Sequence, residues 1–422
     1  MAEETLYCVY ESFSGETPAL MGRLYAGSLR GKECCAFAWE EAWLRTHADL
    51  PPLDPDLQPF PGRQYPPAER AVFGALADSA PDRWGRRLLR SREAVQAARE
   101  GRPPRQLRET DFLLGVQDGT RMGALRFAAG PEGPFLAGEE EGEAAPPWRT
   151  LSALEEACLA REAAEERGEE DGRALRLLLA PGAALGGARP KASVRAADGS
   201  LWVAKFPSRK DGQDTGAWEM VAHELAAACG LRVPEARLER LSGAGSTFLV
   251  RRFDREGRRR IHFASAMALL GKTDGASGQD GSSYLDLAEF LMNGGAAPEE
   301  DLPELWRRMV FSMAIANVDD HLRNHGFLLT PRGWRLSPAY DLNPVPFGDR
   351  LSLNVTLDEA RLDPALALET ASFYGLAPGE AERQLQGILE IVRGQWRPLA
   401  DRFGISRKEQ EAMAPAFTRC GS

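Results

Sequence analysis

The strongest pattern of apolar and polar positions lies in the last third of the chain. Four apolar residues recur there at helical spacing: Leu305, Met309, Val310 and Met313. The apolar pattern stops at Asn317, and polar residues crowd together up to residue 325. Residues 326–329 and 334–336 are apolar enough for two short strands, and the turn residues between them favour a hairpin. This part of the sequence therefore predicts a helix, a polar loop and a β-hairpin.

A second hairpin pattern occupies residues 192–196 and 201–206, joined by an Asp-Gly turn. On its second strand Val203 and Lys205 share one face, whereas Trp202, Ala204 and Phe206 share the other. A lysine inside such an apolar strand is costly unless its ammonium meets an anion. The alternative is a lysine at a sheet edge whose ammonium reaches water.

The segment just before this hairpin is rich in glycine and proline. Pro181, Gly182, Gly186 and Gly187 allow backbone N–H groups to converge on an anion, and Arg189 and Lys191 add positive charge. The order of the glycines is neither that of a Walker A loop nor G-x-G-x-x-G. The segment therefore predicts either an anion-binding loop or an ordinary surface turn.

The remaining pattern predicts an α+β protein. Strands are expected at residues 6–10, 24–25 and 34–39, with 43–44 as a further candidate, and again at 235–238 and 247–253. Residues 216–229 predict an amphipathic helix that ends at Gly230. The mixed-charge run 155–173 predicts a helix with a solvated face, or else a partner surface. Most of the chain after residue 260 predicts helices.

Composition narrows the classes of protein. The 422 residues carry a net charge of −10, which argues against a general nucleic-acid binder. No apolar run is long enough to span a bilayer, and the first residues do not form a signal peptide. The six cysteines show no metal-binding spacing. We therefore expect a reduced, cytoplasmic protein that does not contact membranes.

Candidate chemistry centres on Asp319, Asn324 and Asp341. Asp319 and Asp341 bracket the predicted hairpin at residues 326–336, and Asn324 follows Asp319 by five residues. Transfer of a phosphoryl group to a hydroxyl needs a carboxylate beside the acceptor and oxygen ligands that hold Mg²⁺ against the phosphates. Protein kinases place their catalytic Asp, metal-binding Asn and metal-binding Asp in this order.

Two other interpretations fit the same residues. A polar loop that caps a helix would explain them without any chemistry. A metallohydrolase would instead use Asp320, His321 and His325 as metal ligands.

Taken together, the motifs resemble those of the HipA-like serine/threonine kinases, which are the toxins of toxin–antitoxin pairs. Six segments in one order carry the resemblance: 73–85, 186–191, 203–206, 250–255, 317–324 and 338–344. The likeness implies a two-lobed protein-kinase-like fold with an N-terminal α/β subdomain and a mainly helical C-terminal lobe. It places an N-terminal subdomain in residues 1–130, the rest of the upper lobe in 131–255, and the C-terminal lobe in 256–422.

The resemblance also implies a role for each matching residue. ATP and Mg²⁺ would bind between the lobes. Asp319 would be the catalytic base, and Asn324 and Asp341 would hold the metal. Nucleotide contacts would come from two groups: Gly186, Gly187, Ala188, Arg189, Lys191 and Lys205 before residue 206, and Arg251, Phe253, His321, Asn324, Tyr340 and Asp341 after it.

Family members commonly autophosphorylate a serine in the glycine-rich loop. This chain has Ala183 and Ala184 there, so that control is absent. The family's known targets include aminoacyl-tRNA synthetases, and its usual partner is a small helix-turn-helix antitoxin that binds operator DNA. The resemblance therefore implies a growth-inhibiting kinase that meets DNA only through its antitoxin. A nucleotide-binding co-repressor without catalysis is the alternative.

Overall fold

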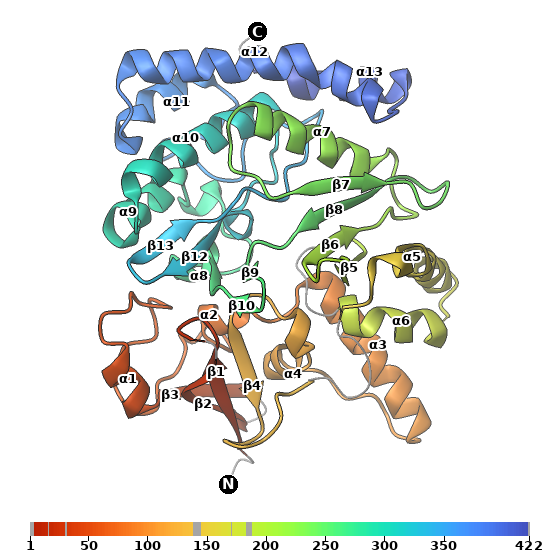
Figure 1. Cartoon of the computed structure of the whole chain (residues 1–422), viewed down its shortest axis with the longest axis vertical. Coiled ribbons are helices and arrows are strands. Elements are labelled where there is room, and N and C mark those ends of the chain that lie inside the picture. Colours follow the sequence, from red (N-terminus) through yellow and green to blue (C-terminus); the bar gives the residue numbers. More distant parts are fainter. Residues whose placement is uncertain are drawn as a thin grey trace. The chain divides into compact units, whose positions relative to one another are not determined.

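The computed structural model describes residues 4–15, 17–29, 32–137, 145–169, 171–182 and 188–420 (Figure 1). The chain divides into two compact units. Unit 1 comprises Met1–Asp211 and Arg240–Ala264, and unit 2 comprises Gly212–Glu239 and Ser265–Ser422. Each unit combines helices and strands, as expected for an α+β chain. The boundary at residue 130, between the expected N-terminal subdomain and the rest of the upper lobe, stays a prediction.

The first part of unit 1 is an antiparallel four-stranded sheet with the strand order β3-β2-β1-β4. Its strands and helices are β1 (Thr5–Glu11), β2 (Ala19–Leu29), β3 (Lys32–Trp39), α1 (Glu41–Thr46), α2 (Gly74–Ala77), α3 (Arg83–Arg99), α4 (Glu109–Leu114) and β4 (Leu125–Ala128). The candidate strand at residues 43–44 is wrong, because these residues lie in helix α1. Trp43 packs there flat against Trp39 and His47, which a helical turn allows and an extended strand would not.

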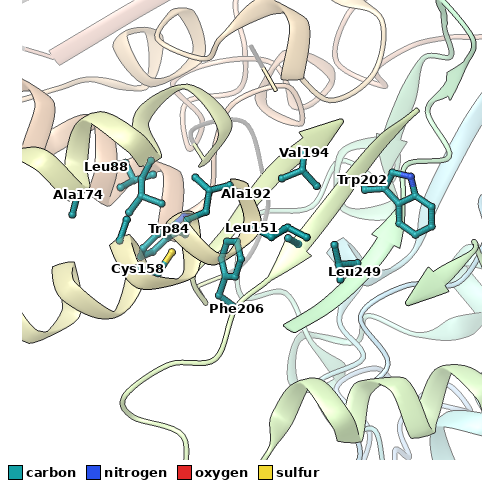
Figure 2. Packing of buried hydrophobic residues seen from close by; sticks show 14 of the residues in the cluster. Trp84, Leu88, Leu151, Cys158, Ala174, Ala192, Val194, Trp202, Phe206 and Leu249 are labelled. Carbon is teal, nitrogen blue, oxygen red and sulfur yellow. The ribbon is translucent and has the colours of Figure 1, made fainter. Parts of the chain in front are cut away.

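The second part of unit 1 places a sheet against helices. It contains α5 (Leu151–Glu166), α6 (Gly172–Gly182), β5 (Lys191–Arg195), β6 (Leu201–Lys205) and β8 (Thr247–Arg251), with β6 paired antiparallel to both other strands. One face of these strands packs on α3, α5 and α6 (Figure 2). The predicted hairpin at residues 192–206 is therefore confirmed, and Trp202, Ala204 and Phe206 share the buried face as expected.

The solvated face predicted for the mixed-charge run is wrong at three positions. Glu155, Arg161 and Glu162 of α5 are buried. Thr247 donates a hydrogen bond to Glu155, Arg161 donates to Ser91 at 3.0 Å, and Ser208 donates to Glu162 at 2.8 Å. Each of these buried charged groups thus keeps at least one hydrogen bond to a partner from a distant part of the chain, which offsets part of the cost of its burial.

A buried arginine–aspartate cluster joins the segment after β8 to the first part of unit 1. Arg252 forms a two-pronged pair with Asp254 at 2.8 and 2.5 Å and also donates to the carbonyl of Thr120 at 2.5 Å. Arg255 contacts the same carboxylate at 2.7 Å. A second carboxylate, Asp118, binds Arg126 and Arg260; β9 (Arg255–Glu256) and β10 (Arg259–Arg260) carry part of this cluster.

Charge pairing sets the ionisation of the central carboxylate of this cluster. Burial alone would raise the pKa of Asp254, but Arg252 and Arg255 hold it well below its usual range. Arg121, beside them, is wholly buried, and burial lowers its pKa to about 9. Its guanidinium donates to the carbonyls of Ser79, Leu113 and Val116. The buried arginines of this cluster thus pair with the two carboxylates or donate hydrogen bonds to backbone carbonyls.

Unit 2 is mainly helical. Its elements are α7 (Thr215–Ala228), β7 (Ala236–Glu239), α8 (Ala266–Leu269), α9 (Tyr284–Gly294), α10 (Pro298–Ala314), β12 (Gly326–Thr330), β13 (Gly333–Leu336), α11 (Pro364–Thr370), α12 (Pro378–Arg402) and α13 (Arg407–Thr418), and β11 (Phe263–Ser265) lies where the chain passes from unit 1 to unit 2. Helix α12 packs along α7, and α10 contacts α9, α11 and α12 (Figure 1). The apolar stripe predicted around Leu305 and Met309 is the buried face of α10.

Two local predictions in unit 2 are confirmed. Helix α7 ends before Gly230, whose φ of +74° is a left-handed conformation that glycine adopts without strain. The hairpin of β12 and β13 pairs Phe327 with Leu336 and Thr330 with Gly333.

Within the described ranges, none of the helices has both the length and the apolar character needed to cross a bilayer.

We predict that Asp254→Asn lowers the stability of the folded chain by about 3–5 kcal/mol, because it leaves Arg252 and Arg255 buried without their shared charge. The midpoint of urea denaturation measures this loss. The folded-state pKa of Asp254 is depressed, so its contribution is complete above the unfolded pKa of about 4 and is lost as the pH falls through the folded value. The difference between wild type and variant should therefore shrink in strong acid.

The matched control is Glu256→Gln, which breaks an exposed pair with Arg259. We expect it to change stability by less than about 1 kcal/mol. Equal effects of the two substitutions would contradict a supporting role for the buried cluster.

Candidate active site

The loop at residues 317–325 connects α10 to β12 and contains two neighbouring aspartates with opposite environments. Asp319 is exposed, whereas Asp320 is buried. Asp320 accepts hydrogen bonds from the hydroxyl of Ser312 at 2.9 Å and from that of Tyr284, and its other oxygen lies 3.1 Å from Nε2 of His325. These partners come from α10, α9 and the end of the loop itself, so Asp320 fixes the loop to two helices.

The same contacts determine the ionisation of this cluster. Burial would raise the pKa of Asp320, but the facing His325 and the two hydroxyl hydrogen bonds bring it below its usual value. Burial, reinforced by the charge of Asp320, raises the pKa of Tyr284 well above its usual range. Asp320 is therefore an anion surrounded by donors, and Tyr284 stays protonated as one of them.

Asp319 and Asn324 are joined within the loop. The side-chain amide of Asn324 donates from Nδ2 to the carbonyl oxygen of Asp319 at 2.9 Å. Since the nitrogen of the amide is used in this way, its oxygen Oδ1 is turned to the other side, where it can accept. Residues 322–324 form a single 3-10 turn that supports this arrangement.

Asp341 is brought to the same loop by its neighbour. The hydroxyl of Tyr340 donates to the carbonyl of Arg323 at 2.6 Å. This bond holds Tyr340, and with it the adjacent Asp341, close to Asn324, which directly follows Arg323. The backbone N–H of Asn343 also lies 3.3 Å from Oδ1 of Asn317. Asp341 has a φ of +60°, a left-handed conformation that is uncommon for a residue other than glycine. Such strained residues tend to occur at functional sites.

These contacts bring Asp319, Asn324, Tyr340 and Asp341 into one region of unit 2. Carboxylate oxygens and an amide oxygen turned outward are ligands that suit Mg²⁺. His325 instead faces Asp320 within the buried cluster, and His321 is half-buried. Throughout the part of the chain that the structure describes, no three His, Cys, Asp or Glu side chains gather as ligands for a metal ion.

The predicted anion-binding residues of unit 1 lie on the strand face opposite the buried core. Lys191 of β5 and Lys205 of β6 are direct cross-strand partners. Their side chains therefore stand beside each other on the face that also carries Val203, and Nζ of Lys205 lies 5.8 Å from the ring centre of Phe248. Lys191 is buried and Lys205 is half-buried, so the two side chains share a partly enclosed face of the sheet.

The glycine-rich segment is only partly described. Gly186, Gly187, Ala183 and Ala184 lie outside the described residues, and Ala188 is exposed. Arg189 forms a two-pronged pair with Asp211 at 2.7 and 2.5 Å. Its charge is thus already met by a carboxylate in this structure.

The predicted adenine contacts flank a structural residue. Arg251 is exposed, and the ring centre of Phe253 lies 6.1 Å from that of Phe263. Arg252 between them belongs to the buried cluster with Asp254. The residues 251–253 therefore alternate between the outside and the inside of unit 1.

The sequence alone indicated no physical role for the segment around Trp84, but the structure shows one. The buried Trp84 lies near Leu88, Cys158 and Ala192 (Figure 2), and its Nε1 donates to the carbonyl of Lys191 at 3.0 Å. This side chain supports the start of β5. Tyr284 was also missed, and Asp320 was considered only as a possible metal ligand rather than as an anchor of the loop. An aspartate next to Asp319 was the only signal available for them.

Comparison with known proteins agrees with this arrangement. Residues 183–416 match the family described as HipA-like C-terminal domain. The Sinorhizobium fredii protein named "Putative kinase Y4dM" is 29% identical over 163 residues, which cover 35% of this chain and 39% of that protein. The chain thus spans about two fifths of the length of this curated relative.

The fold has a solved counterpart. HipA of Shewanella oneidensis MR-1, solved in a complex with HipB and its operator DNA, aligns over 97% of this chain and 96% of its own, with a TM-score of 0.65 and 16% identity. The fold is therefore the two-lobed, kinase-like α+β fold of that protein. Because the family match covers more than half of its residues, the chain belongs to the family of proteins with a HipA-like C-terminal domain.

We predict that Asp320→Ala destabilises the protein by about 3 kcal/mol, because it leaves the buried hydroxyls of Tyr284 and Ser312 without their acceptor and removes the carboxylate that faces His325. Urea denaturation measures the loss. Amide hydrogen exchange across residues 317–325 should become faster. The control is Asp319→Ala, at the exposed neighbour, which should cost no more than about 0.5 kcal/mol. A destabilisation of equal size in both variants would contradict the anchoring role of Asp320.

Proposed function

We propose that the chain is an ATP- and Mg²⁺-dependent protein kinase that transfers phosphate to serine or threonine hydroxyls. The observation that carries the proposal is the linked set of hydrogen bonds from Asn324 to Asp319 and from Tyr340 to Arg323. They bring the exposed Asp319 close to the oxygen-bearing side chains of Asn324 and Asp341, which supports a role in phosphoryl transfer.

In the proposed reaction Asp319 accepts the proton of the acceptor hydroxyl as its oxygen bonds to the γ-phosphorus. The bond from that phosphorus to the bridging oxygen breaks, and ADP leaves with the electron pair. Lys205 and Lys191 bind phosphate oxygens through their paired ammonium groups. Asn324 and Asp341 would hold Mg²⁺, which neutralises charge on the phosphates when bound.

Family membership supports a more specific role. By its likeness to the Shewanella HipA, solved with HipB and operator DNA, we propose that the chain acts as a growth-inhibiting toxin with an antitoxin partner of the helix-turn-helix type. DNA contact would then be indirect. The resemblance in sequence suggests a translation component, such as an aminoacyl-tRNA synthetase, as the substrate. Phosphoproteomics that compares cells making the wild-type and the Asp319→Asn proteins would identify it.

We predict that Asp319→Asn lowers the rate of phosphate transfer by a factor on the order of 10²–10⁴, because the acceptor loses its base. ATP affinity measured by calorimetry should stay close to the wild-type value, since this residue acts on the hydroxyl. Asp358→Asn, at an exposed acid on a later loop, is the control and should retain full activity. Unimpaired transfer in the Asp319 variant would refute this assignment.

We predict that Asp341→Asn reduces the effect of Mg²⁺ on ATP affinity, because Asp341 is the charged one of the two proposed metal ligands and loses its charge. Calorimetric titrations with Mg²⁺ and with a chelator measure the effect directly. The wild-type protein should bind ATP more tightly with Mg²⁺, and the difference should narrow at least several-fold in the variant. The same dependence on Mg²⁺ in both proteins would place the metal at other residues.

A further inference from the structure

The segment between β13 and α11 exposes apolar side chains to an unusual degree. Phe347 is 84% exposed and Leu357 is 76% exposed, which are the highest values among the large apolar residues of the described chain. Both follow Asp341 and precede helix α11. An aromatic ring left in water forfeits the free energy that its burial would provide, so a ring this exposed is a candidate for contact with another molecule.

The backbone on both sides of Phe347 is held firmly. Arg419, at the end of α13, donates to the carbonyl of Pro346 at 3.2 Å and to that of Gly348. Gly348 also packs so tightly on Val318 that an added Cβ would lie 2.2 Å from Cγ1 of that residue. The ring is therefore presented to solvent from a fixed position.

That fixed position adjoins the proposed catalytic base. Val318, which touches Gly348, directly precedes Asp319. Nearby, the backbone N–H of Val345 donates to the carbonyl of Ala316 at 3.2 Å. Phe347 and Asp319 are thus each one residue from a direct contact, so their backbones lie no farther apart than about three to four residues of extended chain.

We propose that Phe347 determines acceptor specificity by packing against an apolar side chain of the protein substrate, about three residues from the phosphorylated hydroxyl. This inference rests on the proposed kinase function. A segment that delivers its hydroxyl to the exposed Asp319 passes close to Val318 and Gly348, next to the exposed ring of Phe347. An apolar side chain buries the ring, whereas a charged one would lose hydration there without a partner.

The test uses a peptide library with one central serine, in which each flanking position is varied in turn. The full-length protein is incubated with Mg-ATP, and both peptide phosphorylation and ATP hydrolysis are measured. The wild-type protein should favour an apolar residue at one flanking position by a factor on the order of ten. Phe347→Ala should lose this preference and keep its ATP hydrolysis. Phe347→Glu should instead favour Lys or Arg at the same position.

Phe373→Ala is the matched control, because Phe373 is another exposed phenylalanine of unit 2, at 54% exposure. It should retain the wild-type preference. The inference is overturned if Phe347→Ala keeps the preference, if the wild type transfers phosphate without one, or if it hydrolyses ATP without phosphorylating any peptide. If the wild-type protein neither hydrolyses ATP nor phosphorylates any peptide, the proposed kinase function is refuted, and the inference with it.

Discussion

A single buried carboxylate, that of Asp320, holds the polar loop of residues 317–325 in place. Its oxygens meet donors on α9, on α10 and at the end of the loop. A buried anion is stable only when it is surrounded in this way, so the loop has one favourable arrangement and few alternatives. The exposed Asp319 is therefore positioned by its buried neighbour, and Asn324 and Tyr340 extend the same order to Asp341.

Unit 1 achieves a comparable order with arginine side chains. Arg252 and Asp254 join the strand β8 to the first part of the unit, while Arg121 is neutralised largely by backbone carbonyls. On the other side of the same sheet, Trp84 supports the carbonyl of Lys191. The face of β5 and β6 that carries Lys191 and Lys205 thus rests on contacts that are remote from it in sequence. Polar groups fix the positions, and the apolar cluster of α3, α5 and α6 supplies the burial.

Local patterns in the sequence were sufficient for the two hairpins, for α7 and for α10, because periodicity and turn residues act over short distances. The polar loop was located in the same way, together with Asp319, Asn324 and Asp341. Burial of Glu155 and Glu162 was not predictable, because their partners Thr247 and Ser208 lie far along the chain. Nor can sequence distinguish Asp319 from Asp320: in an irregular loop no periodicity tells which of two identical neighbours faces inward.

The left-handed backbone at Asp341 opposes fold stability to the metal-binding role that we propose for this residue. Glycine adopts this conformation at no steric cost, so Asp341→Gly would relieve local strain of about 1–3 kcal/mol while removing the carboxylate. Laboratory evolution that rewards heat resistance alone would therefore tend to discard this side chain. Any effort to make a sturdier variant has to screen for turnover at the same time, because at this residue the two goals select different amino acids.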